Sequence, residues 1–246
     1  MTSKEIFSRT ELLVGPEGMA KLGAARVALL GVGGVGSWCA EALVRGGVTH
    51  LTIVDSDIVS VTNINRQAMA DTTTVGRPKV EALRDRLLAI NPEAEIEAIQ
   101  KIYCDETADE FDFGKYDAVI DCIDSLKDKI TLIMRATASP ARFYSALGAG
   151  LKVDPTKVRV AEFWSVRGCP LGSALRKKMR REGKEPAKPF LCVYDDEVLP
   201  NKGEPEDPSG PSGGSTSKAV VNGTFAHITG IFGFTLAGLV ISDVLR

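Results

Sequence analysis

The stretch that decides the fold is Arg26–Asp57, RVALLGVGGVGSWCAEALVRGGVTHLTIVDSD. Its apolar start at residues 27–30 predicts a buried parallel strand, and a G-x-G-x-x-G motif follows at residues 31–36. A helix is expected over residues 37–45, and a second buried strand over residues 50–54. This succession of strand, glycine loop, helix and strand predicts an α/β fold with a doubly wound, mainly parallel Rossmann-like sheet.

The glycine motif supplies the first candidate site residues. Glycines let the backbone turn tightly and approach a phosphate, and the N-terminus of the following helix offers unpaired N–H groups and a favourable dipole. Asp55 follows the second strand, about 20 residues after the motif, where a carboxylate can bond a ribose hydroxyl. The alternative is a tight strand–helix turn that binds nothing. The predicted nucleotide-binding residues here are Gly31, Gly33, Gly34, Gly36 and Asp55.

The residues that follow Asp55 indicate which nucleotide is bound. They form the pattern D-x-D-x(5)-N-x-N-R-Q at residues 55–67, and G-R-P-K follows at residues 76–79. A dinucleotide mainly needs one acid for its ribose, whereas triphosphate oxygens need cations such as Arg66 and Lys79. Lys79 also lies in the first turn of a predicted helix, where a cation opposes the helix dipole, so a role at the site is favoured over a solvated side chain.

Carboxylates at the same edge of the sheet suggest a metal ion. Asp57 lies in the loop after the second strand, and Asp124 follows a predicted strand at residues 116–120. Because Mg²⁺ takes a few oxygen ligands plus waters, Asp57 and Asp124 are predicted to hold it beside the phosphates. Asn63 is expected to contact the phosphates or else to be a turn residue, and Asp124 could also be an N-cap of the helix predicted at residues 125–138.

With these motifs, the chain resembles the ubiquitin-activating-enzyme-like superfamily of adenylating enzymes, which includes the molybdopterin and thiamine sulfur-carrier activators. The resemblance covers roughly residues 9–124. Within the superfamily, the chain looks most like the branch of tRNA threonylcarbamoyladenosine dehydratases. The features that suggest this branch are LGVGGVGSW at residues 30–38, VTNINRQ at residues 61–67, and the absence of zinc-binding cysteines towards the end of the chain.

The resemblance implies a reaction and a set of partners. The reaction is ATP-dependent adenylation of the carboxylate of N6-threonylcarbamoyladenosine in tRNA, followed by ring closure with net loss of water. ATP and Mg²⁺ are the implied cofactors, and Arg66, Lys79 and Asp124 are implied catalytic residues. A homodimer is also implied, in which Arg9 reaches the triphosphate of the other subunit; otherwise Arg9 is a solvated surface arginine. A sulfur-relay protein is a further possible partner.

The rest of the chain predicts how the sheet continues. Further strands are expected at residues 94–102 and 143–147, and an alternating strand at residues 158–164 predicts an antiparallel extension of the sheet. Residues 1–246 are interpreted as a single adenylating-enzyme-like domain. Residues 168–217 are expected to form a basic segment and a mobile crossover loop within it.

A basic run, LRKKMRREGKEPAK, lies at residues 175–188. Such a run is usually a solvated helix face. On a chain with a net charge of −2, however, the clustering favours contact with the phosphate backbone of RNA. The predicted RNA-binding residues are Arg176, Lys177, Lys178, Arg180 and Arg181.

The remaining features bear on location and on the core. Residues 222–241 are apolar enough to suggest a membrane helix, but their glycines and polar residues favour a buried helix on the sheet or at a dimer interface. His227 at its start is a weak candidate for the site. The five cysteines are scattered without a C-x-x-C motif, so neither a disulfide framework nor a structural zinc site is indicated, and Cys192 is expected in the core. We expect a cytoplasmic protein that does not associate with a membrane.

Other functions also fit parts of the pattern. An activating enzyme for a ubiquitin-like sulfur carrier shares the ATP chemistry but adenylates a protein C-terminus. An NAD-dependent oxidoreductase shares the glycine loop but binds NAD. A non-catalytic nucleotide-binding scaffold would bind ATP without exchanging pyrophosphate.

Overall fold

The computed structural model describes residues 3–203 and 222–246. Within them, a seven-stranded sheet has the order β3-β2-β1-β4-β5-β7-β6, and each neighbouring pair is parallel except β6 with β7. The predicted α/β fold with a doubly wound sheet and an antiparallel extension is therefore confirmed. The strands are β1 (Arg26–Leu30), β2 (His50–Val54), β3 (Glu95–Ile99), β4 (Ala118–Asp121), β5 (Arg142–Ala146), β6 (Arg159–Glu162) and β7 (Leu191–Tyr194).

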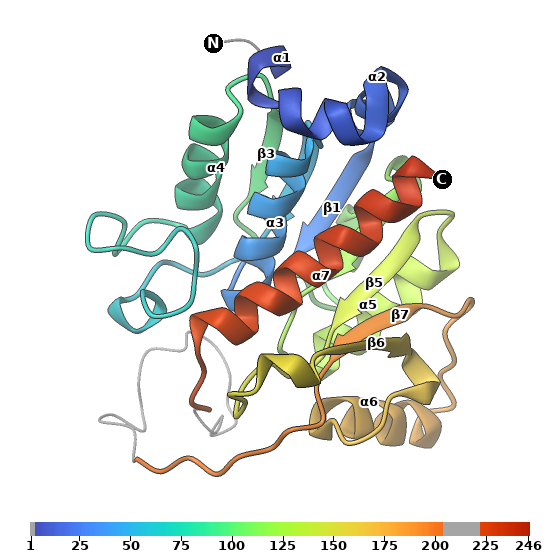
Figure 1. The fold of residues 1–246 in the computed structure, drawn as a ribbon. Coiled ribbons are helices and arrows are strands. Elements are labelled where there is room, and N and C mark those ends of the chain that lie inside the picture. Colours follow the sequence, from blue (N-terminus) through green and yellow to red (C-terminus); the bar gives the residue numbers. More distant parts are fainter. Residues whose placement is uncertain (1–2, 204–221) are drawn as a thin grey trace.

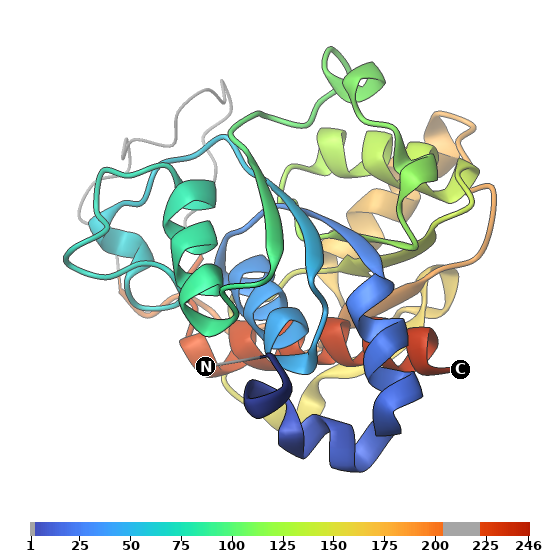
Figure 2. The same cartoon turned by 90° about the horizontal axis from the view of Figure 1, so that it is seen from above.

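Helices cover both faces of the sheet. Figures 1 and 2 show α3, α4 and α7 on one face and α5 and α6 on the other. The α-helices are α1 (Ser3–Ile6), α2 (Ser8–Ala24), α3 (Gly34–Gly46), α4 (Lys79–Ile90), α5 (Leu126–Ala138), α6 (Pro170–Arg181) and α7 (Ala226–Leu245). Short 3₁₀ helices are η1 (Val61–Asn63), η2 (Ala108–Glu110), η3 (Phe113–Lys115), η4 (Pro155–Lys157) and η5 (Phe163–Ser165).

The apolar run of β1 fixes this layering. Because side chains alternate along a strand, Val27 and Leu29 point to the α3 and α7 face, whereas Ala28 and Leu30 point to the α5 face. All four side chains are at most 2% exposed, so β1 needs cover on both faces. The continuous apolar pattern therefore produces a central strand with helices on either side.

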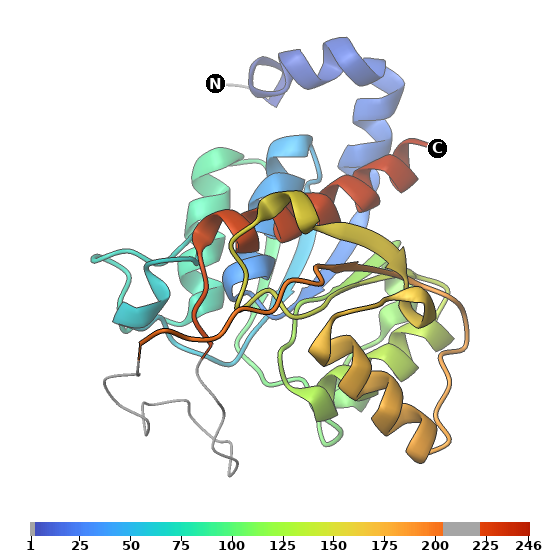
Figure 3. The same ribbon diagram turned by 60° about the horizontal axis from the view of Figure 1, so that its bottom comes forward.

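The apolar C-terminal segment forms α7, which crosses the sheet and α3 (Figures 1 and 3). Among the described residues, α7 is the one helix long and apolar enough to span a membrane by length and composition. Its inner side chains, including Ile228, Phe232 and Leu236, are fully buried in the core. A Cβ added to Gly233 would lie 2.6 Å from the carbonyl oxygen of Val35, so α7 packs closely against α3. The expected packing of a buried helix on the sheet is confirmed.

The boundaries differ from those expected in a few places. The helix after the glycine motif begins at Gly34, inside the motif, rather than at residue 37. The strand expected over residues 94–102 ends at Ile99. Ser125, whose side chain accepts the N–H of Asp128, is the N-cap of α5, so the alternative N-cap role for Asp124 is wrong. Of the predicted mobile loop, residues 204–217 lie outside the described residues.

Candidate nucleotide-binding site

The glycine loop turns sharply between β1 and α3. Gly31 has φ +87°, and a Cβ there would lie 2.6 Å from the carbonyl oxygen of Cys122. At Gly36 a Cβ would lie 1.9 Å from the carbonyl oxygen of Gly31, so neither position admits a side chain. The backbone of the loop is therefore closely packed at the end of β1. Helix α3 begins within the loop, at Gly34. The first N–H groups of a helix lack intrahelical acceptors and form a natural anion site.

Asp55 is attached to this loop by hydrogen bonds. One carboxylate oxygen accepts the N–H of Val32 at 2.8 Å, and the other accepts the N–H of Asp57 at 2.9 Å. Burial raises the pKa of Asp55, while the nearby ammonium of Lys79 opposes that shift. Asp55 therefore lies at the glycine loop as expected, and its contact with a ribose stays a prediction.

Lys79 and Asp57 form an ion pair beside Asp55. The Lys79 Nζ lies 2.7 Å from a carboxylate oxygen of Asp57, and the Lys79 N–H donates to the Asp57 carbonyl at 2.9 Å. Lys79 is the first residue of α4 and is only 6% exposed, whereas Asp57 is exposed. The structure thus gives Asp57 a role in holding Lys79, and its role as a metal ligand stays a prediction.

Both the backbone and the side chain of Arg66 make hydrogen bonds beside the glycine loop. Its carbonyl accepts the indole N–H of Trp38 from α3 at 2.9 Å, and its guanidinium donates to the carbonyl of Thr62 at 2.8 Å. Burial lowers the pKa of Arg66, and the negative charge of Asp124 opposes that shift. Arg66 and Asp124, predicted from separate segments, are therefore brought close together.

Two further side chains of the N-x-N-R-Q motif, Asn63 and Gln67, are buried. The amide oxygen of Asn63 accepts the N–H of Ser60 at 3.1 Å and closes a capping box on η1, which leaves the amide NH₂ as the group able to donate to a phosphate. Gln67 was not among the candidates. It is 5% exposed, and its buried amide oxygen has no hydrogen-bond partner among the described residues. A Cβ on Gly33 would lie 3.8 Å from the Gln67 amide nitrogen, so the motif itself was the signal for a further site residue.

Arg9 lies at the opposite end of the sheet from the candidate site. It is exposed and belongs to α2, which ends just before the first residue of β1 and so lies at the amino end of the strands. The glycine loop lies at the opposite, carboxyl end of β1 (Figure 1). The single chain does not bring Arg9 to its own site.

The first half of the basic run, up to Arg181, forms the second half of α6. One of the predicted RNA-binding residues in it is misassigned. Arg176 is 8% exposed, donates to the carbonyl of Phe163 at 3.0 Å and lies 5.9 Å from the centre of the Phe163 ring. The prediction that Arg176 binds RNA is corrected, because its guanidinium is buried in this packing. Arg180 is exposed, with its guanidinium 5.1 Å from the centre of the Trp164 ring. The other candidates are exposed Lys177 and Arg181 and half-buried Lys178.

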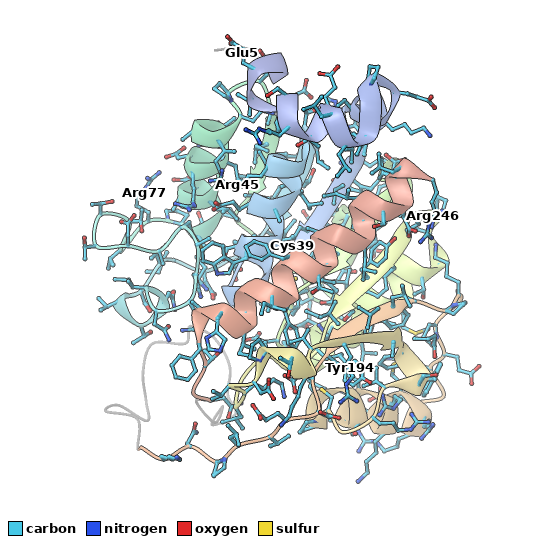
Figure 4. The ribbon with its side chains drawn as sticks, in the orientation of Figure 1. Glu5, Cys39, Arg45, Arg77, Tyr194 and Arg246 are labelled. Atoms are coloured by element: carbon cyan, nitrogen blue, oxygen red, sulfur yellow. The ribbon has the colours of Figure 1, made fainter. Side chains whose placement is uncertain are left out.

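The weaker candidates have structural roles. A ring nitrogen of His227 lies 2.9 Å from the carbonyl oxygen of Val153, which fixes the start of α7. Cys192 is fully buried in β7, and burial raises the pKa of its thiol well above the ordinary value. Cys39 is buried on α3 where α7 crosses it (Figure 4). All five cysteines are free thiols.

The fold and this edge are those of an α/β protein of the nucleotide-binding type, with a glycine loop at the end of β1 and with Arg66 and Lys79 in the segments that follow β2. The ThiF family model matches residues 7–245, so the chain belongs to the ThiF family. It is 42% identical over 192 residues to the tRNA threonylcarbamoyladenosine dehydratase of Bacillus subtilis, covering 78% of this chain and 74% of the relative. It is 33% identical over 243 residues to the enzyme of the same name from Haemophilus influenzae, a match that covers 94% of this chain and 90% of the relative.

A solved structure is similar over almost the whole chain. It is the crystal structure of Escherichia coli tRNA N6-threonylcarbamoyladenosine dehydratase in complex with ATP, with a TM-score of 0.84 and 28% identity. The match covers 98% of this chain and 94% of that chain. The resemblance to this branch of adenylating enzymes is therefore confirmed.

Proposed function

We propose that this chain is an ATP-dependent enzyme that converts N6-threonylcarbamoyladenosine in tRNA to its cyclic, dehydrated form. The observation that carries the proposal is the carboxyl edge of the sheet, where the glycine loop, Arg66, Lys79 and Asp124 converge. This edge belongs to a chain that is similar over most of its length to enzymes named for that reaction.

The reaction divides into two steps. A carboxylate oxygen of the modified nucleoside attacks the α-phosphorus of ATP and pyrophosphate leaves, which gives an acyl adenylate. An internal nucleophile of the same nucleoside then attacks the activated carbonyl carbon and loses its proton to solvent, and AMP leaves with the carboxylate oxygen. The protein supplies no nucleophile in this scheme. It contributes by positioning the two reactants and by balancing the charge on the phosphates.

Each part of the site has a role in that scheme. The free N–H groups at the start of α3 bind phosphate oxygens, and Asp55 accepts a ribose hydroxyl. Lys79 and Arg66 offset the triphosphate charge, and the amide of Asn63 donates to a phosphate oxygen. Because Lys79 is nearly buried, its ammonium has few competing interactions with water.

The donor set at this edge fits Mg²⁺. Asp124 has an exposed carboxylate beside Arg66, and Mg²⁺ in nucleotide sites commonly takes one or two carboxylates, with phosphates and waters completing its shell. Among the described residues no group of three or more His, Cys, Asp or Glu side chains that could hold a metal ion occurs. We assign Asp124 as the ligand, whereas Asp57 remains a weaker candidate because it pairs with Lys79. The ion would neutralise charge on the departing pyrophosphate.

The exposed cations of α6 supply a surface for tRNA. Lys177, Arg180 and Arg181 are exposed on a helix whose last turn is basic. Arg180 also stacks on Trp164, which orders its guanidinium for a phosphate. The cytoplasmic location stays a proposal, which is supported only by the proposed tRNA substrate.

A homodimer completes the site in this proposal. Arg9 is exposed at the wrong end of its own sheet, so it can serve a triphosphate only in a second subunit. A sulfur-relay protein as a further partner rests on the resemblance alone and is tested by copurification.

Pyrophosphate exchange tests the adenylation step. Labelled pyrophosphate should enter ATP when tRNA carrying threonylcarbamoyladenosine is present, and tRNA without that modification should not support exchange. Exchange that instead requires a ubiquitin-like sulfur carrier would favour the carrier-activating function. Binding of NAD in preference to ATP would favour an oxidoreductase.

A further inference from the structure

A fully buried ion pair lies directly beneath the candidate site. Lys129 of α5 and Asp121, the last residue of β4, are each 0% exposed, and Lys129 Nζ lies 2.8 Å from Asp121 Oδ2. The same oxygen accepts the hydroxyl of Ser145 from β5 at 2.7 Å. Neither charged residue belongs to the nucleotide-binding set described above.

The pair is bonded to the segment that carries Asp124. Asp121 Oδ1 accepts the N–H of Ile123 at 3.0 Å, and Lys129 Nζ donates to the carbonyl of Ile123 at 2.9 Å. Both backbone groups of the residue before Asp124 are therefore held by this pair. These hydrogen bonds link the end of β4, residue 123 and the start of α5 to one another.

The same segment also packs on the glycine loop. The N–H of Cys122 donates to the carbonyl of Leu30 at 2.8 Å, and the Cys122 carbonyl is the group that excludes a Cβ at Gly31. A shift of residues 122–124 would therefore displace either Asp124 or the glycine loop.

Stability alone is a poor explanation for such a pair. Removing two charges from water costs several kcal/mol per ion, and well-packed apolar residues often serve a core as well or better. The Lys129 ammonium instead pairs with the buried carboxylate of Asp121 and donates to the carbonyl of Ile123, the residue before Asp124. We infer that Asp121, Lys129 and Ser145 are positioning residues, which hold residues 122–124 so that Asp124 meets the nucleotide-bound Mg²⁺. This inference rests on the metal role proposed for Asp124.

The test uses a double variant that removes both charges and nearly keeps their volumes, Asp121→Asn with Lys129→Met. Calorimetry measures ATP affinity at increasing Mg²⁺, and hydrogen exchange measures protection of the amides at residues 122–124. We expect the Mg²⁺ concentration for half of the affinity gain to rise about tenfold, as for other residues that orient a metal ligand. ATP affinity without Mg²⁺ should change less than about twofold, and the amides at residues 122–124 should exchange faster.

Two further variants keep the test decisive. Ser145→Ala removes one bond to Asp121 with little change in volume, and it should shift the Mg²⁺ dependence in the same direction by about two- to threefold, even where the double variant fails to fold. Lys188→Met is the matched control, since Lys188 donates to the carbonyls of Ser139 and Ala141 near the amino end of β5. It should lower Tm. It should leave unchanged both the Mg²⁺ dependence of ATP affinity and the exchange rates of the amides at residues 122–124.

The possible failures are distinguishable. Wild-type Mg²⁺ dependence and wild-type exchange in the folded double variant would overturn the inference, and so would an equal Mg²⁺ shift in Lys188→Met. If wild-type protein binds ATP independently of Mg²⁺, or if Asp124→Ala keeps the Mg²⁺ dependence, the metal role of Asp124 fails first. The exchange rates then still decide whether the pair holds residues 122–124.

Discussion

Lys79 and Asp57 hold each other at the start of α4, with the ammonium 2.7 Å from the carboxylate and the backbones joined by a hydrogen bond of 2.9 Å. Burial raises the pKa of Asp55, and the positive charge of the Lys79 ammonium partly offsets this rise. In the proposed complex, triphosphate oxygens compete with Asp57 for this cation. The pair holds the Lys79 ammonium near Asp55 before the nucleotide binds, which reduces the conformational entropy lost on binding.

Lys79→Met should weaken ATP binding by about tenfold to a hundredfold, because a hydrogen bond to a charged group contributes about 1.5–3 kcal/mol. The loss should be much smaller for AMP, which lacks the β- and γ-phosphates. Calorimetry with ATP and AMP measures both. Equal losses for the two nucleotides would show that Lys79 does not contact those phosphates. Arg77→Met is a suitable control, since Arg77 is half-buried just before α4 and its guanidinium pairs with Asp85 of that helix.

Removing three charges from α6 should weaken tRNA binding without changing ATP affinity. The variant is Lys177→Ala, Arg180→Ala and Arg181→Ala, and it leaves buried Arg176 in place. The slope of log affinity against log salt should become shallower by about two to three, because fewer counterions are released. A filter-binding series at several salt concentrations measures the slope.

A control variant decides whether this surface is specific. It removes the same number of charges from other elements, at Lys21, Arg84 and Lys115. If the control lowers the salt slope as much as the α6 variant does, the cations of α6 contribute only to net charge and do not form the tRNA surface.

Arg9→Ala and Lys79→Ala should each abolish turnover, and mixing the two inactive proteins should restore part of it. Each mixed dimer would hold one site with both cations intact if Arg9 acts across the interface. Subunit exchange is confirmed by native mass spectrometry before product is assayed. Exchange without recovered activity would place Arg9 outside the partner's site.

Glu197 should make stability depend on pH in the acid range. Its carboxylate accepts the N–H groups of Val153 and Asp154 and pairs with Lys157, which lowers its pKa from 4.5 to about 2. A depressed folded-state pKa stabilises the protein above pH 4.5, and this contribution is lost as the pH falls towards 2. Glu197→Gln should therefore lower Tm at pH 7, and the gap to wild type should close between about pH 4.5 and 2. A constant gap across that range would contradict the role of the charge.

Local sequence patterns predicted the half of the fold that carries the glycine loop. The run over β1, the glycines and the apolar β2 are short-range signals, and the structure has each of them at nearly the expected residues. Asp55, Arg66 and Lys79 could be nominated because they follow strand ends or open a helix at one edge of the sheet. That logic needs only the order of the elements.

Packing between distant elements could not be predicted in the same way. Arg176 reads as one charge in a basic run, and only the approach of η5 places Phe163 against it. Lys129 reads as a polar position on an amphipathic helix, and only the docking of α5 on β4 buries it against Asp121. In both cases the side chain's partner comes from an element whose position no local pattern specifies.

Nucleoside analysis of tRNA tests the proposed reaction itself. tRNA carrying N6-threonylcarbamoyladenosine is incubated with the protein, ATP and Mg²⁺, then digested and examined by mass spectrometry. We expect the modified nucleoside to lose the mass of one water and AMP and pyrophosphate to form in amounts equal to the cyclic product. Lys79→Met should greatly slow the formation of all three. An unchanged nucleoside, in the presence of protein that binds ATP, would contradict the proposed reaction.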